Sequence, residues 1–157
     1  MDRKDIKQLF RSIAQSHGFK CRTSRYSWVV GQWHAECWLY NSQWDSGMYI
    51  DVGIRPLENS HESLEDMKSM QYRVVDYDCP HHDMLRTLES QSETLSASDA
   101  TMVADWTMSH IKSEWPSLEV IATKALDIAL HQRIGALVSG GMQRWATAYL
   151  ESLPKTS

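Results

Sequence analysis

The hydrophobic periodicity of this chain changes near residue 18, from the spacing of a helix to the spacing of a strand. Between Asp2 and His17 the apolar side chains recur every three or four residues, which places them on one face of a helix. Gly18 follows the last turn, as a left-handed helix end requires, and Phe19 is expected to pack back onto the helix. From Tyr26 onward apolar and polar residues alternate. The chain therefore begins with one helix and continues into a sheet.

Alternation with a period of two predicts three or four early strands and a further strand after an acidic loop. The expected strands are residues 19–22, 26–30, 33–40, 48–55 and 71–77. Gly31-Gln32 suits a tight hairpin turn, and residues 41–47 supply the next reversal. One face of this sheet is apolar. The opposite face is polar but aromatic, and it receives His34, Glu36, Trp38, Tyr40, Tyr49 and Asp51.

Helical spacing returns in the second half of the chain. A short helix is expected at 84–88, and Ser98 or Asp99 is expected to cap a longer one that Pro116 ends. Two more helices are expected at 117–130 and 142–150. The 157 residues suffice for one domain with a core. We predict a single α+β domain over residues 1–157, with an N-terminal helix, an antiparallel sheet of about four to five strands, and C-terminal helices packed on the sheet.

The cysteines and the first residues indicate a cytoplasmic protein. Three cysteines leave at least one thiol unpaired, and none lies in a CxxC arrangement. The opening MDRKDIKQ has no apolar stretch behind its charges, and no window approaches a membrane span. We therefore expect a cytoplasmic location, no membrane association and no native disulfide.

Charge is distributed unevenly along the chain, whose formal net charge is -4. Residues 1–26 carry seven basic and two acidic side chains, whereas residues 41–110 carry four basic and thirteen acidic ones. An acidic segment repels nucleic-acid phosphates and attracts a basic protein. We therefore expect a basic protein as partner and no nucleic acid bound through the acidic region. The basic first segment is typical of the solvated face of a surface helix.

The segment DYDCPHHD concentrates side chains of the types that bind metals. They are Asp76, Asp78, Cys79, His81, His82 and Asp83. Adjacent histidines cannot easily point at one ion from a regular element, and turn or cap chemistry also produces such a loop. We expect no metal and no cofactor. A metal-assisted hydrolase that uses the loop at 76–83 stays open as an alternative function.

The sequence assigns no catalytic residue. The GxSxG motif is absent, and Cys37 alternates toward the apolar side of its strand, where thiols are usually inert. Glu36 and Asp51 could face each other on neighbouring strands, yet cross-strand acids are usually no more than solvated charge. Gly140-Gly141 lacks the lysine and spacing of a phosphate loop.

Seven tryptophans are the least ordinary feature of the composition. Most are expected in the core, namely Trp28, Trp33, Trp106 and Trp145. Trp38 differs because it alternates onto the polar face, and Trp44 differs because it stands in a turn beside Asp45. Large aromatic side chains among acids are typical of binding hot spots.

Three segments together resemble a known kind of domain: the helix end Gly18-Phe19, the aromatic stretch CWLYNSQW at 37–44, and above all GMYIDVGI at 47–54. They are similar to a family of small bacterial α+β domains of unknown function, and the similarity is clear over the first half of the chain. Members of that family, and similar compact domains, occur among predicted immunity proteins of bacterial toxin systems. The resemblance implies an α+β fold and the binding of a protein, and it implies no catalytic residues.

Our first hypothesis is a non-enzymatic, cytoplasmic protein-binding module, in the manner of an immunity or antitoxin-like protein that masks a basic partner such as a toxin. Its expected binding residues are Trp38, Tyr40, Trp44, Asp45, Tyr49 and Asp51. The aromatic side chains would set the lifetime of the complex, and the acids would set its association rate. The second hypothesis is the metal-assisted hydrolase that uses the loop at 76–83. The third is a small-molecule-binding domain with its pocket between the sheet and the helices.

Overall fold

The computed structural model describes residues 1–57, 68–74, 79–132 and 136–155. Six strands form one antiparallel sheet in which spatial order equals chain order. They are β1 (Lys20–Arg22), β2 (Arg25–Val30), β3 (Trp33–Asn41), β4 (Met48–Pro56), β5 (Met70–Arg73) and β6 (Leu137–Val138). The helices are α1 (Arg3–Ser16), α2 (His82–Ser90), α3 (Ala97–Glu114), α4 (Leu118–His131) and α5 (Gly140–Ser152), with a 3₁₀ turn at Ser92–Thr94.

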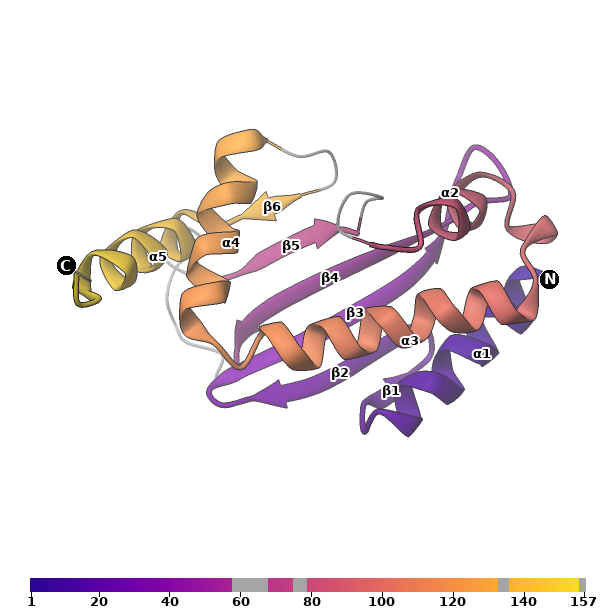
Figure 1. Cartoon of the computed structure of the whole chain (residues 1–157), viewed down its shortest axis with the longest axis horizontal. Coiled ribbons are helices and arrows are strands. Elements are labelled where there is room, and N and C mark those ends of the chain that lie inside the picture. The colour runs from indigo at the N-terminus through magenta and orange to yellow at the C-terminus, as the bar shows by residue number, and fades with distance from the viewer. Residues whose placement is uncertain (58–67, 75–78, 133–135, 156–157) are drawn as a thin grey trace.

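The predicted α+β fold is confirmed, with its N-terminal helix and with C-terminal helices packed on an antiparallel sheet. In Figure 1, α3 runs across one face of the sheet beside α1. The sheet has six strands, more than the four to five expected. β6 is the strand that the sequence analysis missed, because two residues are too few for an alternation. It pairs with β5 through Met70 and Gln71.

Local chemistry explains where the first helix begins and ends. The Asp2 carboxylate accepts a hydrogen bond from the backbone N–H of Asp5 at 2.8 Å and so caps the N-terminus of α1. Gly18, with a φ of 85°, leaves the helix in the left-handed region, as expected. The cap of α3 differs from the expectation: Ser96, not Ser98 or Asp99, is the N-cap, and its hydroxyl accepts from the N–H of Asp99 at 3.1 Å.

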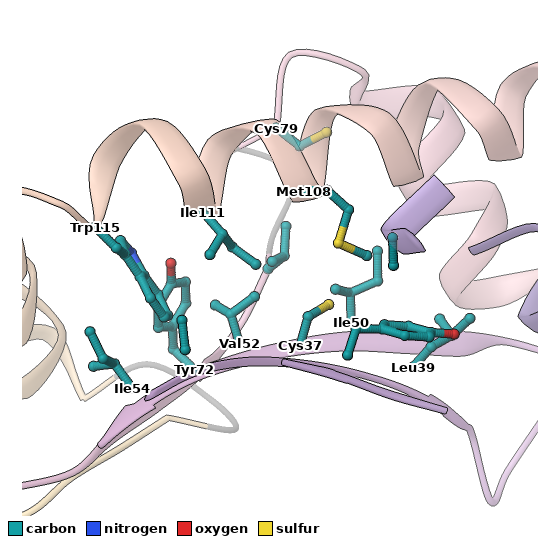
Figure 2. Close-up of a cluster of buried hydrophobic side chains, with 14 of the residues drawn as sticks. Cys37, Leu39, Ile50, Val52, Ile54, Tyr72, Cys79, Met108, Ile111 and Trp115 are labelled. Carbon is teal, nitrogen blue, oxygen red and sulfur yellow. The ribbon is translucent and has the colours of Figure 1, made fainter. Parts of the chain in front are cut away.

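The core lies between the sheet and α3, as Figure 2 shows. The apolar sheet face is formed by β3, β4 and β5 and supplies Cys37, Leu39, Ile50, Val52, Ile54 and Tyr72. Met108, Ile111 and Trp115 point down from α3 onto these side chains. Of the tryptophans expected in the core, Trp33 is buried. Three others are partly buried and pack against the core cluster: Trp28, Trp106 and Trp145.

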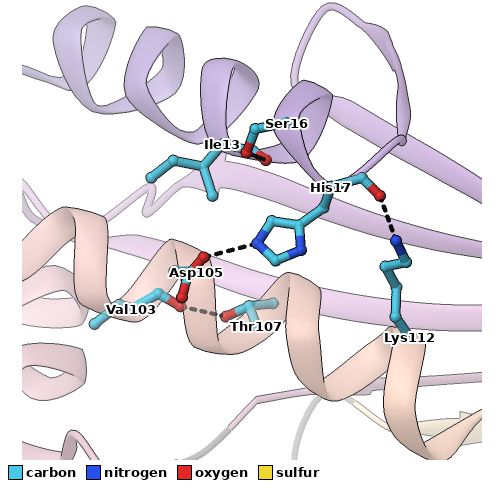
Figure 3. A network of polar contacts seen from close by, with 7 residues as sticks. All are labelled: Ile13, Ser16, His17, Val103, Asp105, Thr107 and Lys112. Carbon is cyan, nitrogen blue, oxygen red and sulfur yellow. Dashed lines mark hydrogen bonds and ion pairs between the residues drawn. The ribbon is translucent and has the colours of Figure 1, made fainter.

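Polar contacts join α1 to α3 at the C-terminal end of α1 (Figure 3). The His17 ring nitrogen Nε2 lies 2.7 Å from Oδ1 of Asp105. Lys112 Nζ donates to the backbone carbonyl of His17 at 2.7 Å. A cation at this position complements the negative end of the helix dipole. These contacts set how α1 lies along α3.

Among the helices of the described residues, none has the length and apolar composition needed to cross a membrane.

Candidate binding surface

The strand register assembles a polar surface on the side of the sheet opposite α3. One cross-strand row runs from Arg22 through Arg25, Trp38 and Asp51 to Arg73, on β1 to β5. Every second row places its side chains on this same side, because successive residues of a strand alternate between the two faces and cross-strand partners share one. We call this surface the polar face and define it by Lys20, Arg22, Arg25, His34, Glu36, Trp38, Tyr40, Tyr49, Asp51, Arg55, Gln71 and Arg73.

Arginine side chains lie against the aromatic rings of the polar face. The guanidinium carbon of Arg25 is 5.4 Å from the centre of the Trp38 ring. That of Arg73 is 3.9 Å from the ring of Tyr49 and 5.7 Å from the ring of Tyr40. Arg73 also donates a hydrogen bond to the Tyr40 hydroxyl. These are cation–π contacts, and they leave the edges of the guanidinium groups for other partners.

Asp51 lies at the centre of the polar face and is only 6% exposed. Its Oδ2 accepts a hydrogen bond from the Gln71 amide at 3.3 Å, and its Oδ1 lies 3.6 Å from Nε of Arg73. Burial raises the pKa of this carboxyl group, and the Gln71 and Arg73 contacts oppose the rise without cancelling it. Asp51 is thus a buried group within the network, not a surface charge that steers a distant partner.

Glu36 is the second carboxylate of the polar face and is 5% exposed. Its Oε1 accepts from Nη2 of Arg55 at 3.1 Å and lies 3.3 Å from Nδ1 of His34. The two acids of the polar face are not cross-strand partners, because Glu36 lies opposite Gly53 and Asp51 lies opposite Trp38. Each is held by a separate basic side chain from a neighbouring strand.

The Trp38 ring reaches across β4 above Gly53. A Cβ atom at position 53 would lie 2.8 Å from the ring atoms Cη2 and Cζ3 of Trp38. Only a glycine at position 53 leaves room for the Trp38 ring. The segment GMYIDVGI therefore contains, in Gly53, the residue over which Trp38 packs. Trp38 is partly exposed and lies on the face away from α3, not beneath the C-terminal helices.

Two hollows flank the Trp38 ring. The Arg25 hollow, of about 560 Å³, is lined by Lys7, Thr23, Ser24, Arg25, Trp38, Leu39, Tyr40, Asn41, Asp51 and Gln71. The Glu36 hollow, of about 250 Å³, is lined by Arg25, His34, Glu36, Trp38, Gly53, Ile54, Arg55, Ser69, Met70, Gln71 and Leu137. Both hollows share Arg25, Trp38 and Gln71 of the polar face, and Lys7 of α1 also lines the Arg25 hollow.

Trp44 and Asp45 belong to the loop between β3 and β4. Trp44 is 91% exposed. The loop beneath it is held by Arg3 of α1, whose guanidinium donates to the carbonyls of Ser42, Asp45, Ser46 and Gly47. Within the loop, the carboxylate of Asp45 accepts from the Gly47 N–H at 2.8 Å. Trp44 is therefore presented on a loop of defined shape.

The structure brings together four of the six expected binding residues: Trp38, Tyr40, Tyr49 and Asp51. Trp44 and Asp45 lie in the loop beyond the strand ends. The sequence analysis missed Arg25 and Arg73, which contact these aromatic rings. Alternation along their own strands could have placed both on the polar face. Their pairing with Trp38 and Tyr49 depends on register, which no local pattern contains.

The acidic middle of the sequence does not make the polar face acidic. Five basic side chains lie on this face, Lys20, Arg22, Arg25, Arg55 and Arg73, against the buried Glu36 and Asp51. The other described acids of residues 41–110 lie in the β3–β4 loop, in α2 and α3, and in the 3₁₀ turn. Six more acids of that segment fall on 58–67 and 75–78, outside the described residues.

The loop expected to hold a metal falls partly outside the described residues, because Asp76 and Asp78 lie there. Of the remainder, Cys79 is fully buried beside α3, whereas His82 and Asp83 are exposed in the first turn of α2. The thiol and these side chains therefore lie in different environments. Within the described part of the chain, no group of three or more His, Cys, Asp or Glu side chains is arranged to hold a metal ion.

The three cysteines, all of them described, form no disulfide. Cys37 and Cys79 are completely buried, and burial raises the pKa of the Cys37 thiol. Burial also raises the pKa of the partly exposed Cys21. Raised pKa values disfavour the thiolate, so neither Cys21 nor Cys37 is an activated nucleophile.

No protein family, no curated protein and no solved structure matches this chain in comparisons of sequence and structure.

Proposed function

We propose that this chain is a protein-binding module, not an enzyme, and that it binds its partner through the polar face. The observation that supports the proposal is the contact of Trp38, Tyr40 and Tyr49 with Arg25 and Arg73. Tryptophan, tyrosine and arginine are the residues most enriched in interface hot spots. Here they lie on a six-stranded sheet, so little side-chain or backbone entropy is lost when a partner binds.

An immunity-type role is the biological setting that the family resemblance implies for such a module. An immunity protein binds and masks one toxin of the same system. A toxin gene beside the gene for this chain is the observation that this setting predicts.

The test is capture of a partner by tagged chain in its own host, with variants of the polar face. Tyr49→Ala removes one ring and its contact with Arg73. Leu130→Ala is the matched control, because Leu130 is an apolar side chain on α4 that is 78% exposed. Melting temperatures measured in parallel show that each variant is folded.

We expect one protein to be recovered equally by the wild-type chain and by Leu130→Ala. Recovery by Tyr49→Ala should fall by about tenfold or more, as truncation of a hot spot causes. Undiminished recovery by a folded Tyr49→Ala variant would contradict the proposal. So would the absence of any specific partner for the wild-type chain.

A further inference from the structure

Arg25 is a cation whose hydrogen-bond donors have no acceptor in the described part of the chain. Its guanidinium lies over the Trp38 ring, and the side chain is exposed at the rim of both hollows. Arg73 and Arg55, by contrast, each have a carboxylate partner on the polar face. A guanidinium that rests on an aromatic ring is already positioned, and its planar edge matches the two oxygens of a carboxylate.

The Arg25 hollow contains a second cation without a partner in the described residues. Lys7 of α1 lines the same hollow and is half-buried, and no carboxylate contacts its ammonium group there. The acid that lines this hollow is Asp51, which Gln71 and Arg73 already contact. The positive charge of Lys7 and Arg25 is therefore not balanced within the hollow.

The turn that forms one rim of the hollow is conformationally unusual. Thr23 joins β1 to β2 with a φ of 55°, in the left-handed region that a β-branched residue rarely adopts. Strained residues of this kind are enriched at binding sites, where the surrounding structure maintains them. The turn places Arg25 directly after it, at the start of β2.

We propose that the Arg25 hollow receives a carboxylate side chain, Asp or Glu, of a partner protein, bound by Arg25 with Lys7 beside it. This inference rests on the proposed function and concerns the chemistry of its partner. It differs from the basic partner that the charge of the sequence predicts, because the acids on which that expectation depended are either buried on this face or lie elsewhere.

An acidic protein fits the polar face better than a nucleic acid does. Single-stranded nucleic acids bind by stacking bases on aromatic rings along a continuous basic groove. Here Arg25 occupies a face of Trp38, and Arg73 occupies a face of Tyr49. Two carboxylates also interrupt the basic side chains at the centre of the surface.

The test uses three probes at low salt: poly-L-glutamate, poly-L-lysine and oligodeoxythymidylate. Binding is followed by NMR of the tryptophan indole N–H groups, so that a shift at Trp38 locates the site. The test variant is Lys7→Gln with Arg25→Gln. The matched control is Lys4→Gln with Arg11→Gln, which removes the same charge from exposed positions of α1.

We expect poly-L-glutamate to bind the wild-type chain and the control pair equally and to shift the Trp38 signal. The Lys7 and Arg25 variant should bind it at least about fivefold more weakly, and added salt should weaken the wild-type complex. Arg25→Lys should not restore full binding, because an ammonium group lacks the planar pair of donors.

Three results would overturn the inference: binding of poly-L-lysine in place of poly-L-glutamate, tighter binding of oligodeoxythymidylate through the same two residues, or no shift at Trp38 with any probe. None of these results would by itself remove the proposed function. That proposal depends on whether aromatic variants of the polar face lose the captured protein.

Discussion

At the scale of single residues, the polar face contains a buried carboxylate. Its burial is unfavourable for folding, so a role in stability does not explain why it is there. Asp51 is a carboxylate withdrawn from water on the face of the sheet opposite the core. Its contacts with Gln71 and Arg73 do not fully compensate for burial, because its pKa remains raised. Buried charges with perturbed pKa values are concentrated at functional sites.

The raised pKa of Asp51 predicts a pH-dependent difference between the wild-type chain and Asp51→Asn. The folded chain favours the protonated carboxyl group, which asparagine imitates. As the pH rises from below the ordinary value of 3.8 through the raised folded-state pKa, the wild-type chain should lose stability relative to the variant. Urea unfolding of both proteins between pH 3.5 and 8 measures this, with the exposed Asp83→Asn as the control. A difference that stays constant, or that favours the wild-type chain at high pH, would contradict the burial argument.

Gly53→Ala should displace the ring of Trp38. The added Cβ would approach the ring to 2.8 Å, so the indole must swing away and lose its contact with Arg25. Because the ring is the far end of a side chain, we expect a modest loss of stability, about 1–3 kcal/mol. The measurements are the Trp38 indole N–H signal and the unfolding free energy. Ser27→Ala, in the same cross-strand row, should leave that signal in place.

At the scale of elements, one arginine connects the first helix to the loop between β3 and β4. Arg3 donates to four backbone carbonyls of that loop, and Ser46 and Ser92 tie the same loop to the segment after α2. Gly47 lies against the backbone of Glu89, where a Cβ would come within 1.8 Å of the carbonyl oxygen. The loop that carries the exposed Trp44 is thus supported by two separate parts of the chain, α1 and residues 89–92.

Arg3→Met should loosen this loop without unfolding the sheet. Hydrogen bonds to a charged group contribute about 1.5–3 kcal/mol, and we expect a loss of stability in that range. Hydrogen exchange at the amides of Trp44 and Gly47 should accelerate more than exchange in β3. Lys4→Met is the control, because Lys4 is the next residue of α1 and its side chain is exposed. It should change neither the stability nor the exchange of the loop amides. Equal acceleration throughout β3 would show that Arg3 acts on the whole fold and not on the loop.

At the scale of the whole molecule, two thiols report on the core. Cys37 lies between the sheet and α3, and Cys79 is buried beside α3, further from the sheet (Figure 2). Neither can meet a reagent until the layer opens, so their reaction follows unfolding of the domain. Cys21 lies outside this layer and is partly exposed.

A thiol reagent should therefore label at most Cys21 in the native protein and all three cysteines in denaturant. Reducing agent should leave the melting temperature unchanged, because the fold contains no disulfide among these cysteines. Rapid labelling of Cys37 or Cys79 under native conditions would contradict the packing of α3. A marked fall of the melting temperature on reduction would contradict the free state of Cys21 and Cys37, since a native disulfide typically contributes about 2–5 kcal/mol.

The sequence alone determined the order of elements and the division of the sheet into two faces. Both follow from periods of two and of three to four residues, which are local properties of the backbone. Helix α1 and strands β2 to β4 therefore lie close to the predicted ranges. The same alternation correctly separated Cys37 from Trp38.

The tertiary structure decided what the polar face is made of. Arg25 and Arg73 come from strands on either side of β3 and β4, and only register places them on Trp38 and Tyr49. The burial of Asp51 likewise depends on neighbours distant in sequence. The sequence pattern predicts a surface charge at this position, but in the fold its carboxylate contacts Gln71 and Arg73. Local charge sums add every acid of a segment, whereas a folded surface shows only those that its strands and helices expose. For this reason the sequence predicted an acidic surface, and the polar face is basic.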